Sequence, residues 1–305
     1  MKHFDLTTLP WTDRPDFLPE LVARIADDRI AGSEAESLRD WERDGFLRLR
    51  GLLPEDLCDS LLADYERAWV DPPDVSVLSE GVGVAPIGDL DRVSLEHHHY
   101  RLLDFQDVST AATRVMMHPE IIRLLELVFD AQPVLMQTLF FEYGSEQSLH
   151  QDFAYVQADI LSHLVGCWIA LEDVDDENGP LVYLPGSHQI QKFSWSSGGM
   201  VFDGQDELET LSFERHIEAE AERMGLKKLI LHAKKGDVLL WHCALAHGGS
   251  KVLDRNRSRK SIVGHFSTRE GYPRDRRFPG RDPKRREAGG GLLYDRPGNY
   301  RRLEP

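Results

Sequence analysis

Short apolar runs separated by turn residues dominate the chain from about residue 133 onward. Apolar runs bounded by Gly, Pro, Asp and Asn are typical of β-strands. The predicted strands are 134–141, 164–171, 181–184, 238–241 and 261–266. The run 164–171 has no polar face, so we expect it to be buried on both sides. Several short strands joined by such turns favour a β-sandwich or barrel.

The first half of the chain has a helical pattern instead. Residues 34–44 predict a helix that ends at Gly45. Apolar residues at helical spacing predict two more helices, one beginning at Pro54 and one over 117–129. We expect these helices to pack against the outside of the β-structure.

Together these patterns predict one α+β domain with a jelly-roll core. A short apolar strand is expected over 46–53, and residues 71–94, rich in Pro, Gly and Asp, are expected to form a loop. The predicted parts are an N-terminal extension (1–33), the domain (34–268), its jelly-roll core (about 133–268) and a C-terminal extension or lid (269–305).

Composition narrows the class of protein. The 305 residues are 41% hydrophobic and 29% charged, as in soluble globular proteins. No apolar stretch approaches the roughly 18 residues that a membrane-spanning helix needs, so we expect no membrane partner. The net charge of −16 repels phosphate backbones and argues against nucleic acid. Cys58, Cys167 and Cys243 are too widely spaced for a disulfide framework or zinc site, which favours a cytoplasmic location.

The candidate chemistry is concentrated at His150 and Asp152, which follow an apolar strand. Side chains at i and i+2 of a strand point to the same side, so an imidazole and a carboxylate should converge there. A second histidine would complete the triad that leaves positions of an iron ion open for other ligands. His247 is the favoured third ligand because the glycines after it permit close backbone approach. His242 is the alternative.

A candidate anion site lies twelve residues beyond His247. The planar guanidinium of Arg259 can bind a carboxylate through two parallel hydrogen bonds. A 2-oxo dicarboxylate could therefore chelate iron at one end and meet Arg259 at the other. Arg257 is the alternative, because residues two apart on a strand face the same way.

Other histidines and arginines have simpler interpretations. The run His97 to His99 is expected to form a solvated turn or lid, since adjacent residues cannot all face one ion. His188 is expected to be a turn residue. The basic stretch from Arg274 to Arg302 is expected to be a solvated tail.

Several segments, in this order, resemble the phytanoyl-CoA dioxygenase family of iron(II)/2-oxoglutarate oxygenases. They are Asp44 to Leu53, His150-Gln151-Asp152, Cys167 to Leu171, Asn178 to Leu181, Pro185 to His188, Gly236 to Gly248, and Arg259. The resemblance spans roughly residues 36–266. Two departures stand out: Glu142 to Glu146 replaces a stretch like Lys-Pro-Gly, and the spacing from His247 to Arg259 is one residue longer than is common in the family.

The resemblance implies a double-stranded β-helix (jelly-roll) fold with iron(II) bound by His150, Asp152 and His247. It implies 2-oxoglutarate at Arg259 and places Gln137 and Trp168 beside this co-substrate. The implied activity is hydroxylation of a small organic substrate with O₂, which releases succinate and CO₂. Asp152 favours hydroxylation over halogenation, because halogenating relatives have a small residue at that position; desaturation and ring formation are the alternatives to hydroxylation.

Two other classes of function remain open at this point. A zinc or other divalent-metal hydrolase or isomerase on the same fold could use the same ligand cage, although it would not need Arg259. A non-catalytic binding module on this fold is the second alternative.

Overall fold

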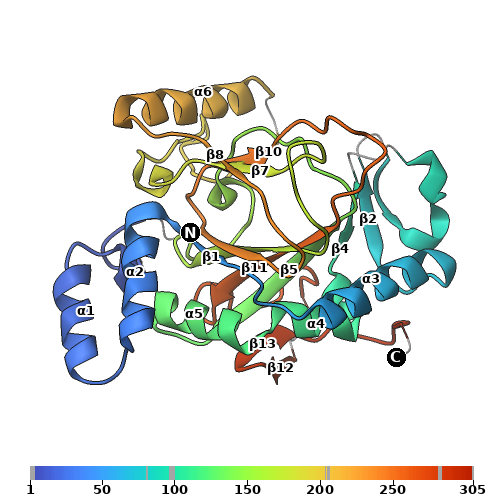
Figure 1. Ribbon diagram of the computed structural model, residues 1–305, viewed down its shortest axis with the longest axis horizontal. Helices are drawn as coiled ribbons and strands as arrows, with labels where there is room; N and C mark the ends of the chain where they lie inside the picture. Colours follow the sequence, from blue (N-terminus) through green and yellow to red (C-terminus); the bar gives the residue numbers. More distant parts are fainter. Residues whose placement is uncertain are drawn as a thin grey trace.

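Two β-sheets form the centre of the computed structural model (Figure 1). The residues described are 4–79, 82–95, 100–202, 204, 207–280 and 284–303. The larger sheet contains β1 (Phe46–Leu49), β2 (Ser76–Ser79), β3 (Gly83–Pro86), β4 (Tyr100–Leu103), β5 (Pro133–Phe141), β6 (Leu164–Ala170), β9 (Val238–His242), β11 (Ser261–Thr268), β12 (Arg285–Ala288) and β13 (Gly291–Tyr294). The smaller sheet contains β7 (Leu181–Tyr183), β8 (Leu229–Leu231) and β10 (His247–Gly249).

The strand order of the larger sheet is β1-β9-β6-β11-β5-β4-β2-β3, and the β12–β13 hairpin joins it at β5. The neighbouring pairs along this path are antiparallel, whereas β13 runs parallel to β5. The smaller sheet has the order β10-β7-β8 and lies over one face of the larger one in Figure 1.

The helices, as far as the chain is described, are α1 (Phe17–Ala26), α2 (Gly32–Asp44), α3 (Glu55–Val70), α4 (Thr110–Met116), α5 (Pro119–Phe129) and α6 (Glu207–Met224). Helices α1 to α5 share one apolar cluster with outward-facing strand residues such as Phe140, Ile169 and Ile262. Helix α6 lies on the opposite side, beyond the smaller sheet (Figure 1). None of the described helices is long and apolar enough to cross a bilayer.

The space between the two sheets holds a separate apolar cluster. Trp168, Leu239 and Val263 from the larger sheet meet Leu181 and Leu231 from the smaller one. Successive strand residues point to opposite faces, so β6, β9 and β11 supply side chains both to this interior and to the helix-covered face. This alternation explains why β6 is buried at every position. The predicted α+β fold with a jelly-roll core is confirmed.

The helix predictions agree closely with the structure. Helix α2 ends at Gly45, whose φ of 77° is in the left-handed region that favours glycine. Pro54 is the N-cap of α3, and α5 covers 119–129. The predicted helices at 34–44, from Pro54 and at 117–129 are therefore confirmed.

Two strand-level predictions were wrong. The strand expected over 46–53 ends at Leu49, and the chain turns through Gly51 at φ 58°. The segment 71–94, expected to be loop, contains β2 and β3. Gly83 and Pro86 are the first and last residues of β3, so these turn-forming residues concealed a hairpin at the sheet edge.

The C-terminal segment was expected to be a solvated tail, and this was wrong for much of it. β13 pairs with β5 at Leu292 and Leu293. Arg277 is largely buried and forms ion pairs with Asp104, Asp107 and Asp275. At the other end, Trp11 and Phe17 belong to the main apolar core, and the indole of Trp11 donates a hydrogen bond to the carbonyl of Leu127. The division into a domain with two extensions stays a prediction.

Candidate metal centre

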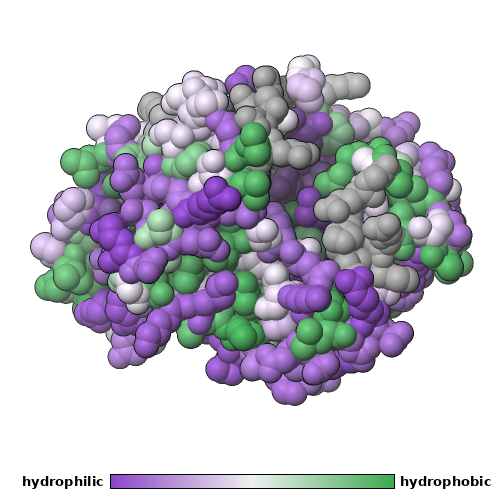
Figure 2. All heavy atoms as spheres, turned by 90° about the horizontal axis from the view of Figure 1, so that it is seen from above, coloured by the Kyte–Doolittle hydropathy of each residue, from purple (hydrophilic) through white to green (hydrophobic). Residues whose placement is uncertain are grey.

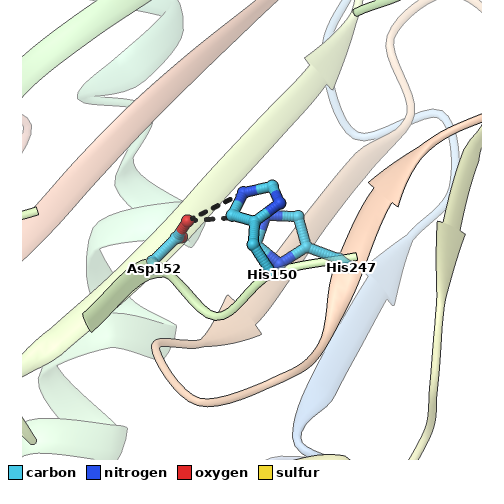
Figure 3. Close-up of side chains that lie close together, drawn as sticks. All are labelled: His150, Asp152 and His247. Atoms are coloured by element: carbon cyan, nitrogen blue, oxygen red, sulfur yellow. Dashed lines mark ion pairs between the residues drawn. The ribbon is translucent and has the colours of Figure 1, made fainter. Parts of the chain in front are cut away.

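His150, Asp152 and His247 lie together between the two sheets, and one possible ligand atom from each lies within 4.8 Å of the others. The Nε2 atoms of His150 and His247 are 3.7 and 3.5 Å from Oδ1 of Asp152. Figure 3 shows both imidazoles facing the carboxylate. All three side chains are at most 13% exposed.

The backbone that carries the triad differs from the expected strand. His150 forms an isolated antiparallel bridge to His247, with reciprocal N–H···O bonds of 2.9 and 3.0 Å. Asp152 is the first residue of a 3-10 helix, Asp152–Ala154. The strand prediction for this segment was therefore wrong. The bridge aligns the two histidines, and the turn after Gln151 directs the carboxylate back toward them.

The glycines after His247 make this bridge possible. A Cβ at Gly248 would lie 2.6 Å from the carbonyl oxygen of Gln147, and one at Gly249 would lie 2.6 Å from Oγ of Ser145. Any larger residue would thus push away the loop that leads to His150. The close approach at these glycines is to the loop that leads to His150; the expected approach to a ligand stays a prediction.

Hydrogen bonds set the orientation of both imidazoles. Nδ1 of His150 lies 2.9 Å from the carbonyl oxygen of Ser148, and Nδ1 of His247 lies 3.0 Å from that of Leu245. A carbonyl only accepts, so in the neutral form of each ring Nδ1 carries the proton and Nε2 keeps its lone pair. Burial, assisted by the neighbouring His247, lowers the pKa of His150 to about 4. His150 is therefore neutral at pH 7 and able to bind a metal.

The second oxygen of Asp152 is held by groups that the sequence analysis did not identify. The indole Nε1 of Trp241 donates to Oδ2 over 2.7 Å, and Nε2 of His265 lies 3.4 Å from the same oxygen. The Trp241 ring also packs 4.6 Å from the ring of His247. A Cβ at Gly166 would lie 2.2 Å from this indole, so the glycine makes room for it. Trp241 therefore fixes both the carboxylate and one imidazole.

A small cavity of about 70 Å³ connects the triad to Arg259. Arg259 is 2% exposed. Within its side chain, Nη2 donates to the carbonyl of Tyr143 at 3.3 Å, whereas Nε and Nη1 have no partner among the described residues. Burial lowers the pKa of Arg259 to about 10, so the group stays cationic at pH 7. A buried guanidinium with unfilled donors is costly and fits an anionic ligand.

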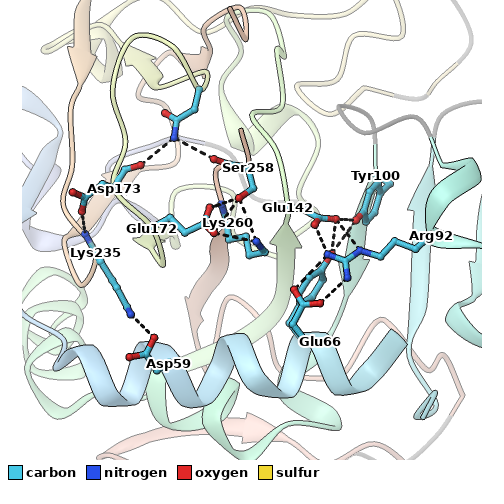
Figure 4. A network of polar contacts seen from close by, with 12 residues as sticks. Asp59, Glu66, Arg92, Tyr100, Glu142, Glu172, Asp173, Lys235, Ser258 and Lys260 are labelled. Atoms are coloured by element: carbon cyan, nitrogen blue, oxygen red, sulfur yellow. Dashed lines mark hydrogen bonds and ion pairs between the residues drawn. The ribbon is translucent and has the colours of Figure 1, made fainter. Parts of the chain in front are cut away.

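Two acids near Arg259, Glu172 and Glu142, are engaged by other side chains (Figure 4). Glu172 accepts from the hydroxyl of Ser258 and from both nitrogens of Lys260. Glu142 accepts from the Tyr65 hydroxyl at 2.7 Å, and from Tyr100 and Arg92. Neither carboxylate neutralises Arg259 directly.

The alternative arginine lies in a different environment. Arg257 is 39% exposed at its side chain and forms a two-bond ion pair with Asp175, at 3.0 and 2.9 Å. Its donors are thus used at the surface, while those of Arg259 point into the cavity.

Trp168 and Gln137 occupy different positions around the site. The ring of Trp168 lines the cavity and lies 5.7 Å from the guanidinium carbon of Arg259. Gln137 is linked to the site through His265, because Nε2 of Gln137 lies 3.1 Å from Nδ1 of that histidine. Val263 and His265 in β11, and Arg259 two residues before that strand begins, follow one another at intervals of four and two residues, and all three line the cavity. This alternation is the sequence signal that could have identified His265.

The remaining histidines lie elsewhere. Nε2 of His242, the alternative ligand, lies 2.9 Å from Oδ2 of Asp13 in the N-terminal segment. His188 belongs to a 3-10 helix, Ser187–Gln189, and donates to the carbonyl of Glu42 at 3.0 Å. His188 thus lies in a single helical turn, close to the predicted turn, and its side chain is buried against α2. The run 97–99 lies outside the described residues.

An outer cleft of about 540 Å³ begins at the triad and opens to solvent. It shares Arg101, Phe141, Ser145, Gln147 and His150 with the inner cavity. Figure 2 looks onto this side of the molecule, where the surface is hollowed near its middle. The rest of its lining is Leu78, Ser79, Tyr100, Glu146, Ser148, Leu149, Tyr155, Phe202, Thr210 and Glu214.

Comparison with known proteins agrees with this geometry. The sequence profile of phytanoyl-CoA dioxygenase matches residues 41–261. The chain belongs to the phytanoyl-CoA dioxygenase family. It is 25% identical over 272 residues to the peroxisomal phytanoyl-CoA dioxygenase of Rattus norvegicus, covering 83% of this chain and 73% of the relative. The corresponding protein of Homo sapiens is 24% identical over 268 residues, with the same coverage.

Solved structures share the fold. The non-heme alpha ketoglutarate dependent epimerase SnoN from nogalamycin biosynthesis matches with a TM-score of 0.59 at 19% identity, covering 87% of this chain and 99% of SnoN. EctD from S. alaskensis, solved with 2-oxoglutarate and 5-hydroxyectoine, matches with a TM-score of 0.55 at 17% identity, covering 79% of this chain and 77% of EctD.

The stretch that departs from the pattern of the phytanoyl-CoA dioxygenase family borders the site. Glu142 and Tyr143 both contact Arg259, through the backbone bond from Arg259 N to Glu142 O (2.8 Å) and the side-chain bond to Tyr143 O. Ser145 lines both the cavity and the cleft. The departure therefore changes the wall of the site and leaves the triad in place.

Proposed function

We propose that this chain is an iron(II)/2-oxoglutarate-dependent dioxygenase that hydroxylates a small organic substrate with O₂ and releases succinate and CO₂. The observation that carries the proposal is a buried His-Asp-His triad that shares one cavity with a buried arginine, for which the described residues offer no carboxylate partner. Imidazole and carboxylate ligands without thiolate suit iron(II).

In this proposal His150, Asp152 and His247 hold the iron, and Arg259 binds the distal carboxylate of 2-oxoglutarate. Iron and 2-oxoglutarate, when bound, supply O₂ activation and attack on an unactivated C–H bond. The protein supplies position: Nε2 of each histidine is left with its lone pair, and Trp241 restrains Asp152 so that Oδ1 faces the metal position.

The other site residues support this arrangement. Trp168 covers the guanidinium of Arg259 and keeps water from it. Gln137 acts through His265, which neighbours the carboxylate of Asp152. Asp152 itself favours hydroxylation over halogenation, because it occupies the position that a halide would need.

The residues that line the cavity support a divalent-metal hydrolase or isomerase less well than they support a dioxygenase. Such an enzyme needs a metal-bound water but no buried cation beyond the metal. Arg259 would then remain a buried charge with unfilled donors. The same residue disfavours a purely structural metal site.

The proposal also covers the size of the substrate, the absence of a nucleic-acid partner and a cytoplasmic location. An outer cleft of about 540 Å³ suits a small molecule, and the net charge of −16 disfavours nucleic acid. Cys58, Cys167 and Cys243 are buried free thiols, which is consistent with a reducing cytoplasm.

Binding of the co-substrate can be tested without knowing the substrate. Anaerobic protein given iron(II) and 2-oxoglutarate should develop the weak visible charge-transfer band of a chelated 2-oxo acid. Admission of O₂ should then give slow succinate formation. Protein that is fully loaded with iron but shows no band at saturating 2-oxoglutarate would contradict the proposal.

A further inference from the structure

The outer cleft carries opposite charges on its two walls. Arg101 from β4 lies on the wall that adjoins the inner cavity, with its guanidinium carbon 5.8 Å from the ring centre of Phe141. Glu214 from α6 lies in the lining of the outer cleft alone. A ligand that spans the cleft therefore meets a positive charge near the triad and a negative charge farther out.

Glu214 is placed to receive a cation. Thr210 and Glu214 are four residues apart on α6, so both face the cleft from one side of the helix. Within the described part of the chain, Glu214 has no hydrogen bond or ion pair to another residue. The other acid of the cleft is already engaged, since Glu146 accepts from the backbone of Val252 at 2.8 Å and lies 3.8 Å from Arg255.

Aromatic rings connect Glu214 to the triad. Burial and the carboxylate of Glu214 raise the pKa of Tyr155, which places the two groups close together. The Tyr155 ring packs 5.8 Å from Phe202 and 5.9 Å from the ring of His150. Aromatic faces beside a carboxylate are a favourable environment for an ammonium group. The ring of Tyr155 thus separates the carboxylate of Glu214 from His150, one of the expected metal ligands.

We propose that the substrate is a compact molecule with a protonated amine, bound with its ammonium group at Glu214 and its reacting carbon over the triad. The inference rests on the proposed function for the position of the reacting carbon. Glu214 lines the outer cleft alone, whereas His150 lines both the cleft and the inner cavity, so the ammonium group would lie away from the triad.

The same lining disfavours an acyl-coenzyme A, although relatives of this chain carry phytanoyl-CoA in their names. Coenzyme A bears several phosphate charges, and phosphate recognition requires clustered cations. Among the described residues of the outer cleft, Arg101 is the single arginine or lysine. One arginine does not provide the clustered cations that several phosphates need.

The test uses three probes matched in size: 2-phenylethylamine, 2-phenylethanol and phenylacetate. Their affinities are measured by calorimetry on the full chain, both metal-free and with iron(II) and 2-oxoglutarate under nitrogen. The amine should bind at least about tenfold more tightly than the alcohol, as expected for a charge-assisted contact. Glu214→Gln should bring this ratio close to one.

Glu218→Gln is the matched control, because Glu218 is exposed one turn farther along α6 and lies outside the cleft lining. It should keep the amine preference. Equal binding of amine and alcohol by the wild type, or a preference that survives Glu214→Gln, would overturn the inference. Benzoyl-coenzyme A that binds as tightly as the amine would overturn the exclusion of acyl-coenzyme A.

The outcomes separate this inference from the proposed function. Protein that binds iron(II) and 2-oxoglutarate without an amine preference keeps the function and loses the substrate class. Protein that shows the amine preference without binding 2-oxoglutarate loses the function.

Discussion

At the scale of single residues, the assignment of the co-substrate depends on Arg259. A charge-assisted bidentate contact contributes about 1.5–3 kcal/mol, which corresponds to roughly 10- to 150-fold in affinity. We predict that Arg259→Gln raises the dissociation constant for 2-oxoglutarate by this factor, measured by titration of the charge-transfer band. Arg259→Lys should recover only part of the loss, because a point charge cannot reproduce the planar fork.

Arg257→Gln is the control for this prediction. Arg257 pairs with Asp175 at the surface, and exposed pairs contribute about 0–1 kcal/mol, so 2-oxoglutarate affinity should hardly change. A large loss in Arg257→Gln together with normal binding by Arg259→Gln would move the role to Arg257.

Trp241 gives a second prediction at this scale. Trp241→Phe keeps a ring against His247 but removes the 2.7 Å hydrogen bond to Asp152. Loss of a partner that orients a metal ligand typically costs 10- to 100-fold in metal affinity or activity, and we expect a loss of that size in iron(II) affinity.

Trp41→Phe is the matched control for the loss of a buried indole. Trp41 is 1% exposed and its Nε1 has no hydrogen-bond partner in the described structure. Iron affinity should therefore be unchanged in Trp41→Phe. Equal iron affinity in both variants and the wild type would show that the Trp241 bond does not position the carboxylate.

The sequence predicted the residues that touch the metal position better than the residues that hold them. His150, Asp152 and His247 belong to short motifs with a recognisable order, and the structure brings them together. Trp241 and His265 were missed because their contacts join strands β9 and β11 to the 3-10 helix that carries Asp152, far apart in the sequence. Such contacts depend on register between β9, β6 and β11, which no local pattern specifies.

At the scale of elements, the two glycines of β10 control how closely the 145–148 loop approaches. Gly248→Ala would place a Cβ 2.6 Å from the carbonyl oxygen of Gln147, closer than atoms in contact can lie. We predict that the loop moves away, that the His150–His247 bridge breaks and that iron(II) binding is lost. Gly32→Ala is the control, since a Cβ there meets nothing within 4 Å.

The measurement is iron binding alongside the free energy of unfolding. The folded protein should persist in Gly248→Ala, because overpacking typically costs about 1–3 kcal/mol. Wild-type iron affinity in folded Gly248→Ala would show that the bridge is not needed to align the histidines.

Element boundaries were predictable where local rules act alone. Gly45 ends α2 and Pro54 begins α3 because their own backbone preferences impose these limits. β2 and β3 were missed because a four-residue edge strand contains too few side chains for an alternating pattern to stand out. Pairing with β4 stabilises β2 from outside the segment.

At the scale of the whole molecule, buried histidines couple stability to pH. Burial, assisted by His242, lowers the pKa of His188 to about 3. Between roughly pH 6.5 and 3 the unfolded chain binds a proton there that the folded chain does not. Stability is therefore lost as pH falls, by about 1.4 kcal/mol per pH unit for this one group.

We predict that His188→Gln reduces the loss of unfolding free energy between pH 6.5 and pH 5 by about 2 kcal/mol. Chemical denaturation at the two pH values measures the difference, whatever the variant costs at pH 7. The control is His232→Gln, whose side chain is 56% exposed in the wild type. A wild-type slope in His188→Gln would mean that His188 takes up its proton in the folded state.

The pairing of β13 with β5 has a consequence for how the chain is made. The apolar edge of β5 at Val134 and Leu135 is covered by residues close to the C-terminus. At about 5–20 residues per second, a ribosome exposes that edge for on the order of 10–30 s before its partner strand is synthesised. Unpaired strand edges are sites of aggregation. A nascent chain of this protein therefore carries this edge of β5 unpaired until β13 has been synthesised.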